Sequence, residues 1–140
     1  MNWLKWLTDL LKPPTELLPI GTMDIFGFTS ILLDKLEEDD KAELYLADSQ
    51  CKVFSKDEVV KFLGLDQTDS IAYVSEKMDC DDYARKLYGK GLPLMWTTVH
   101  ALNWFIDDTG ILWFVEPQTD QISQNMENWP NWDVRFFLTS

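Results

Sequence analysis

The sequence is poor in cysteine, histidine and basic residues. Its 140 residues contain two Cys, one His and 12 Lys or Arg against 24 Asp or Glu, giving a formal net charge of -12. Two cysteines are too few for the disulfide framework of a small secreted domain. Because an anionic surface repels phosphate backbones, nucleic acid is excluded as a partner. Metal binding, a basic partner or mimicry of nucleic-acid charge remain open, as does an acidic surface that only aids solubility.

Long hydrophobic runs and a signal peptide are also lacking. Nowhere do about 18 apolar residues follow one another, so no transmembrane segment is expected. Residues 1–14 have no basic leader or cleavage site. Their apolar spacing predicts an N-terminal amphipathic helix that ends at Pro13 and Pro14. We expect this helix to pack on the domain or on a second copy in a homo-oligomer. These features predict a cytoplasmic protein.

What the sequence does contain is enough apolar surface for one compact domain over residues 1–140. Hydrophobic residues make up 46% of the chain and aromatic residues 14%. The patterns predict helices near residues 29–38, from Ser55 to Gly64, and from Asp79 to Gly89 or Gly91. They predict strands at residues 42–47, 52–54, 94–106, 111–116 and 134–138. The fold class that follows is α+β, with a cysteine-bearing helix packed on an antiparallel sheet.

Cys80 stands in the first turn of the helix that Asp79 is expected to cap. The positive end of a helix dipole favours the thiolate form of such a cysteine. Taken alone, Cys80 is as readily interpreted as a buried structural thiol. Three neighbouring carboxylates make that interpretation less natural, whereas Cys51 has no such surroundings and is interpreted as structural.

His100 and Glu116 lie on the two arms of the predicted hairpin. If Ile106 faces Ile111, the histidine comes within one step of the glutamate, and a one-residue bulge would bring them opposite each other. A carboxylate at that place can orient an imidazole. The alternative is an ordinary hairpin with an incidental His–Glu pair.

Three sequence strings carry a resemblance to a known family. They are MDCDDYA at residues 78–84, VHALNWF at 99–105 and FVEPQT at 114–119. Together they resemble the papain-like and transglutaminase-like cysteine peptidase clan over residues 79–123. The pattern is similar to the papain-like domain of a mushroom galactose-binding agglutinin and to related phage and bacterial domains. The resemblance to the latter implies a phage-encoded protein in a bacterial host as one origin.

The resemblance implies a papain-like domain with its catalytic core at residues 42–140. Cys80 would be the nucleophile, His100 the general base and then acid, and Glu116 the residue that orients the histidine. A peptide or protein would be the substrate. The function predicted is therefore a cysteine-dependent amide hydrolase, a protease-like or transglutaminase-like enzyme acting by acyl transfer. The alternatives are a catalytically inactive papain-like binding domain, a phage accessory or structural domain, and an acidic inhibitor protein.

Asp79, Asp81 and Asp82 surround the thiol with negative charge, which opposes thiolate formation. A bound cation would remove this conflict, and hard oxygen ligands favour calcium. The resemblance also implies calcium as a cofactor. Alternatively, the three carboxylates only stabilise the start of the helix.

Overall fold

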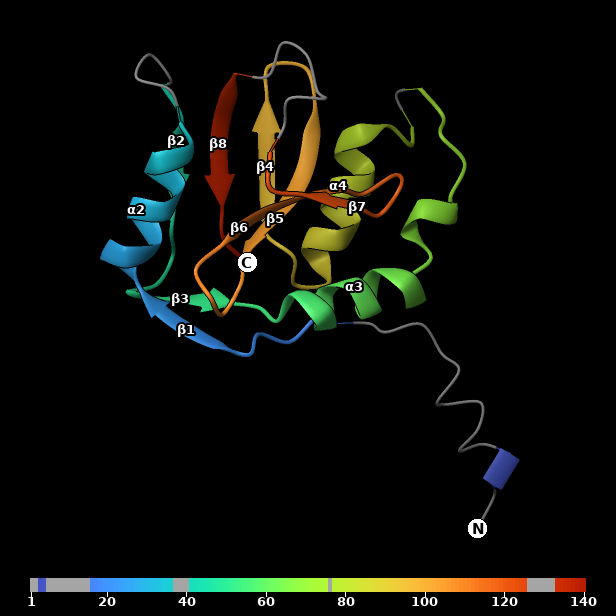
Figure 1. The fold of residues 1–140 in the computed structure, drawn as a ribbon. Coiled ribbons are helices and arrows are strands. Elements are labelled where there is room, and N and C mark those ends of the chain that lie inside the picture. Colours follow the sequence, from blue (N-terminus) through green and yellow to red (C-terminus); the bar gives the residue numbers. More distant parts are fainter. Residues whose placement is uncertain (1–2, 5–15, 37–40, 76, 126–132) are drawn as a thin grey trace.

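The computed structural model describes residues 3–4, 16–36, 41–75, 77–125 and 133–140. Within them the chain folds as an α+β protein, as the sequence predicts (Figure 1). The predicted N-terminal helix falls almost entirely on residues outside these ranges. The described part has no helix with the length and apolar character needed to cross a bilayer.

The described strands form a six-stranded sheet in the order β2-β8-β4-β5-β6-β7, and a second sheet that pairs β1 with β3. The large sheet is antiparallel except at its edge, where β2 runs parallel to β8. The strands are β1 (Gly21–Asp24), β2 (Glu43–Tyr45), β3 (Gln50–Val53), β4 (Leu94–Thr97), β5 (Ala101–Ile106), β6 (Leu112–Glu116), β7 (Gln121–Ser123) and β8 (Val134–Leu138). The helices are α2 (Ile25–Lys35), α3 (Lys56–Leu65), the short 3₁₀ helix η1 (Thr68–Ser70) and α4 (Cys80–Gly89).

Side chains that alternate along the strands build hydrophobic clusters on the two faces of the large sheet. On one face, Phe28 and Leu32 of α2 join a cluster that includes Trp104 and Phe137. On the other face, Ala84 of α4 packs with Leu94 and Ala101. The buried Asn103 side chain of β5 donates to the Ala84 carbonyl oxygen at 2.9 Å. Helix α4 is thereby fixed against β5, the strand that begins directly after His100.

The helix starts are mostly where side-chain capping predicts them. The Ser55 hydroxyl accepts from the Glu58 backbone N–H at 3.3 Å, and α3 begins at the next residue, although it continues one residue past Gly64. Helix α4 begins directly after Asp79, as predicted. Helix α2 starts earlier than predicted because Asp24 caps it, accepting from the N–H groups of residues 26 and 27.

The long strand predicted at residues 94–106 is interrupted. The structure divides it into β4 and β5, and the connecting turn places His100 at its end. The register of the next hairpin is also shifted by one residue, because Ile106 pairs with Leu112 and not with Ile111. Ile111 is held in the turn instead, because the Asp107 carboxylate accepts from its N–H at 3.0 Å.

Candidate functional site

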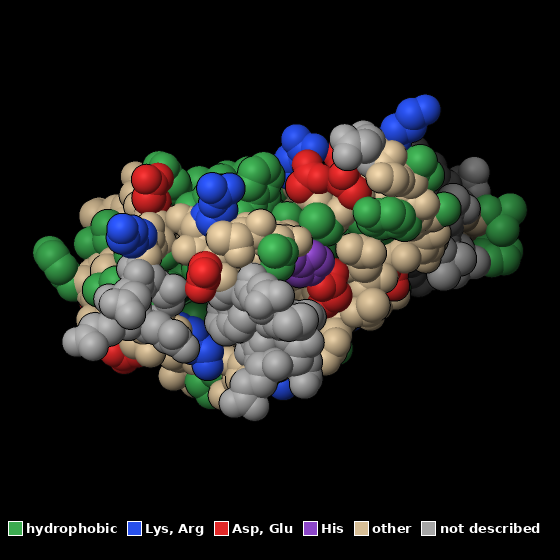
Figure 2. All heavy atoms as spheres, turned by 90° about the horizontal axis from the view of Figure 1, so that it is seen from above, with side chains coloured by type: hydrophobic (Ala, Val, Ile, Leu, Met, Phe, Trp, Pro, Cys, Tyr) green, Lys and Arg blue, Asp and Glu red, His purple; other side chains and the backbone are tan. Residues whose placement is uncertain are grey.

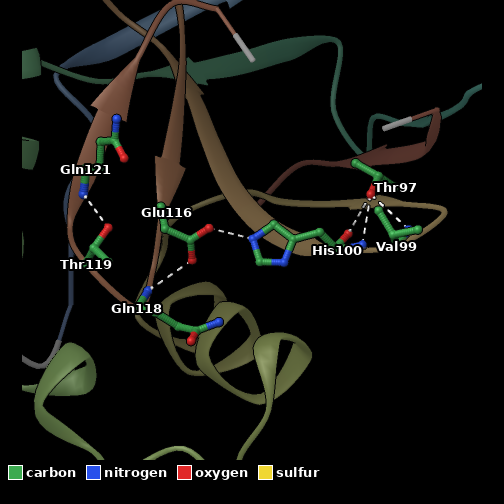
Figure 3. Close-up of polar contacts among 7 residues, drawn as sticks. All are labelled: Thr97, Val99, His100, Glu116, Gln118, Thr119 and Gln121. Atoms are coloured by element: carbon green, nitrogen blue, oxygen red, sulfur yellow. Dashed lines mark hydrogen bonds and ion pairs between the residues drawn. The ribbon is translucent and has the colours of Figure 1, made fainter. Parts of the chain in front are cut away.

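The imidazole of His100 and the carboxylate of Glu116 are in direct contact. His100 Nε2 lies 2.5 Å from Glu116 Oε2, and the side chains are 21% and 11% exposed (Figure 3). With an ionised glutamate, the ring nitrogen donates this bond. The pairing predicted from sequence is present, although His100 lies in a turn and the hairpin register differs from the predicted one.

Glu116 is held from its other side by the turn between β6 and β7. Its second carboxylate oxygen accepts from the Gln118 backbone N–H at 3.2 Å (Figure 3). Its carbonyl oxygen accepts from the N–H groups of Thr119 and Asp120, at 3.2 and 2.8 Å. Because both the backbone and the side chain are bonded, the carboxylate presents Oε2 to His100 in one orientation. The bond to Gln118 carries no sequence signal, since its donor is a backbone group.

Cys80 is the first residue of α4 and is partly exposed. It packs against the cluster that contains Ala84 and Ala101, and Ala101 directly follows His100. The thiol therefore lies in the region where α4 meets the start of β5. Cys51, in contrast, is 3% exposed, and burial raises the pKa of its thiol. The two free cysteines thus have different environments, as the sequence predicts.

Asp79, Asp81 and Asp82 form an acidic cluster at the start of α4. Each offers a carboxylate oxygen, and these oxygens lie within 4.8 Å of one another, so the group can hold a metal ion. Hydrogen bonding to Asp81, followed by burial and by the proximity of Asp82, raises the pKa of Asp79 to about 6. The pKa of Asp82 is lowered, first by the Asp79 backbone N–H, which donates to Asp82 at 3.1 Å.

A countercharge for this cluster comes from the chain itself. Arg85 Nη2 lies 2.7 Å from Asp81 and 2.8 Å from Asp82. The sequence predicts either a metal ion or a helix-capping role for these carboxylates. The spacing of Arg85 from both of them is the ordinary spacing of helical ion pairs, a signal that the sequence also contains. A cation at the cluster would have to compete with the guanidinium.

These groups reach one face of the molecule. Figure 2 shows the histidine at the surface between hydrophobic side chains, with acidic side chains on both sides of it and basic side chains beyond. Chemically, the imidazole can donate or accept a proton, and the carboxylate of Glu116 can stabilise its charged form. The thiol of Cys80 is a free, partly exposed group.

A second group of carboxylates lies close to the Glu116 turn. Asp120 adopts a left-handed backbone conformation with φ 61°. Burial raises the pKa of Asp120 to about 7, with further contributions from the charge and hydrogen bond of Asp69 and the charge of Asp66. Asp66 is itself buried and forms an ion pair with Lys90. Sequence reasoning missed this group because its members are far apart in the chain and no local motif links them.

Comparison with known proteins identifies the fold. No family model and no curated protein sequence matches the chain. Among solved structures, the complex of PSL1a with E64 is similar, with a TM-score of 0.68 and 24% identity over 84% of this chain and 50% of that chain. Polyporus squamosus lectin bound to the human-type influenza-binding epitope Neu5Acα2-6Galβ1-4GlcNAc gives a TM-score of 0.65 and 22% identity, covering 84% and 49%. This chain thus spans about half the length of either matched chain.

The comparisons correct the family assignment made from sequence. No peptidase family matches, and the similar structures are of a lectin, so assignment to the papain-like and transglutaminase-like peptidase clan is wrong, and with it the description as a hydrolase or cysteine protease. The physical reason is that the three strings consist largely of helix-cap and strand residues, which any capped helix packed on a hairpin can use. At these identities, what the chain shares with the lectin structures is a fold.

Proposed function

We propose that this chain is a binding domain whose ligand is a glycan, held at the surface around His100 and Glu116. The proposal rests on the hydrogen-bonded pair formed by the His100 imidazole and the Glu116 carboxylate, which is partly exposed to solvent. Binding sites orient their ligands with a few fixed polar groups beside apolar surface. Here the polar groups are the pair itself, and Val99, which is 61% exposed, offers apolar surface next to the histidine.

The likeness to the lectin supports a glycan over a peptide as the ligand. The bound Neu5Acα2-6Galβ1-4GlcNAc belongs to the matched lectin, and this chain corresponds to about half of that protein. The chain's own net charge of -12 opposes the carboxylate of the sialic acid. We therefore propose that this domain prefers a neutral glycan.

Titration calorimetry with Galβ1-4GlcNAc and with its sialylated form tests this function. We expect saturable binding of the neutral disaccharide, weaker binding of the sialylated one at low salt, and loss of binding in His100→Ala. Lys61→Ala, an exposed change on α3, is the matched control and should bind normally. If neither glycan binds saturably, or if His100→Ala binds as well as the unchanged protein, the proposal fails.

A further inference from the structure

The turn that carries His100 has an exposed tip. It connects β4 to β5, and its residues Thr98 and Val99 are exposed. Thr97, at the end of β4, is only 5% exposed. At the tip, the Thr98 backbone N–H donates to the Asp133 carbonyl oxygen at 3.0 Å, and further hydrogen bonds hold the turn at its base.

The hydroxyl of Thr97 makes most of these bonds. Its Oγ1 accepts from the backbone N–H groups of Val99 at 3.2 Å and His100 at 2.9 Å (Figure 3). It also donates to the His100 carbonyl oxygen at 3.1 Å, which accepts the Thr97 backbone N–H at 2.8 Å as well. A hydroxyl has one donor and two acceptor positions, and all three are used here. Both backbone polar groups of His100 are therefore bonded to a single residue.

We propose that Thr97 is the positioning residue for the imidazole of His100. The inference rests on the proposed function, because it concerns the same site. By holding the N–H and the carbonyl of His100, the hydroxyl fixes the direction in which the side chain leaves the backbone. The ring then reaches Glu116 at 2.5 Å. Strand pairing alone does not do this, since the registered pairs of β4 and β5 end at Trp96 and Ala101.

Two substitutions separate the hydroxyl from the shape of the side chain. Thr97→Val keeps the volume and removes all three side-chain hydrogen bonds, whereas Thr97→Ser keeps the hydroxyl. The readout is the ring N–H proton of His100 in NMR spectra of the free protein, which is slow to exchange while it is bonded to Glu116. We expect this signal in the unchanged protein and in Thr97→Ser. In Thr97→Val it should be lost, with glycan affinity at least about tenfold weaker.

The stability, the ring-proton signal and the glycan affinity of these variants together show whether Thr97 positions the imidazole or only stabilises the fold. A purely structural role would lower the denaturation midpoint of Thr97→Val but leave the ring proton and the affinity unchanged, which would overturn the proposal. If Thr97→Val does not fold, Thr97→Ala takes its place. If neither folds, the fold itself requires the hydroxyl and the proposal is wrong. Loss of the ring proton in a protein that binds no glycan would support the positioning role and refute the proposed function.

Discussion

Replacing Asp120 with Asn should stabilise the protein above neutral pH. The pKa of Asp120 is raised from 3.8 to about 7, first by burial and then by Asp69 and Asp66. An acid whose folded pKa is raised contributes its full stability below its unfolded pKa. That stability is lost as the pH rises through the folded pKa, so the loss falls between about pH 4 and pH 7. Asn removes the charge and tolerates the left-handed backbone at this position.

The size of the effect follows from the change in pKa. At about 1.36 kcal/mol per pKa unit, a change from 3.8 to about 7 corresponds to an upper limit of about 4 kcal/mol. Asp120 is partly exposed, so solvent screens much of the repulsion, and we expect about 1 to 2 kcal/mol. At about pH 5 the carboxyl is protonated in the folded state but already ionised in the unfolded chain, so the variant should show only part of the gain that it shows at about pH 8.

Urea denaturation at about pH 5 and about pH 8 measures this difference. Comparing variant with unchanged protein at each pH cancels the titration of other groups, including Asp79. Asp69→Asn should relieve the same repulsion, so the double variant should gain less than the sum of the single variants. Equal stability of Asp120→Asn and the unchanged protein at about pH 8 would refute the reasoning, as would a gain of the same size at both pH values.

Three further results are expected. Glu116→Gln should weaken glycan binding in calorimetry less than His100→Ala does, because the amide can still bond to the ring; equal affinities in both variants would contradict this role. Arg85→Ala should strengthen calcium binding in calorimetry because it frees two carboxylates; no saturable calcium in either protein would exclude the metal site. Asp107→Ala should cost about 2 to 4 kcal/mol in urea denaturation, since the buried carboxylate accepts four hydrogen bonds; a loss below about 0.5 kcal/mol would contradict the structure.

The parts of the fold that local interactions control could be predicted from sequence. Ser55 and Asp79 immediately precede α3 and α4, and the last strand occupies residues 134–138 as expected. Capping uses backbone and side-chain groups within about three residues, so its signal is visible in a single stretch of sequence. The start of α2 was missed although Asp24 gives the same kind of signal, because the mixed apolar pattern around it has no clear period.

The candidate site was predictable in part. Residue chemistry and hairpin proximity singled out His100 and Glu116, and the structure places them in contact. The predicted register was nevertheless off by one, because pattern alone does not say which residue a turn will recruit. In this turn the carboxylate of Asp107 accepts a hydrogen bond from the Ile111 N–H, and Ile111 lies outside the strand pairing. The ion pairs of Arg85 with Asp81 and Asp82 could also have been predicted, because the three residues have the three- and four-residue spacing of helical ion pairs.

The sequence by itself determined the α+β class, the net negative charge, and the presence of a thiol among three carboxylates at the start of α4. These depend on composition and on neighbours along the chain. Only the tertiary structure decided that the hydroxyl of Thr97 holds the turn at His100, and that Asp120 lies near Asp69 and Asp66. Both depend on how separate segments are brought together. A residue's environment is set by groups within a few ångströms in space, and their distance along the chain does not reveal them.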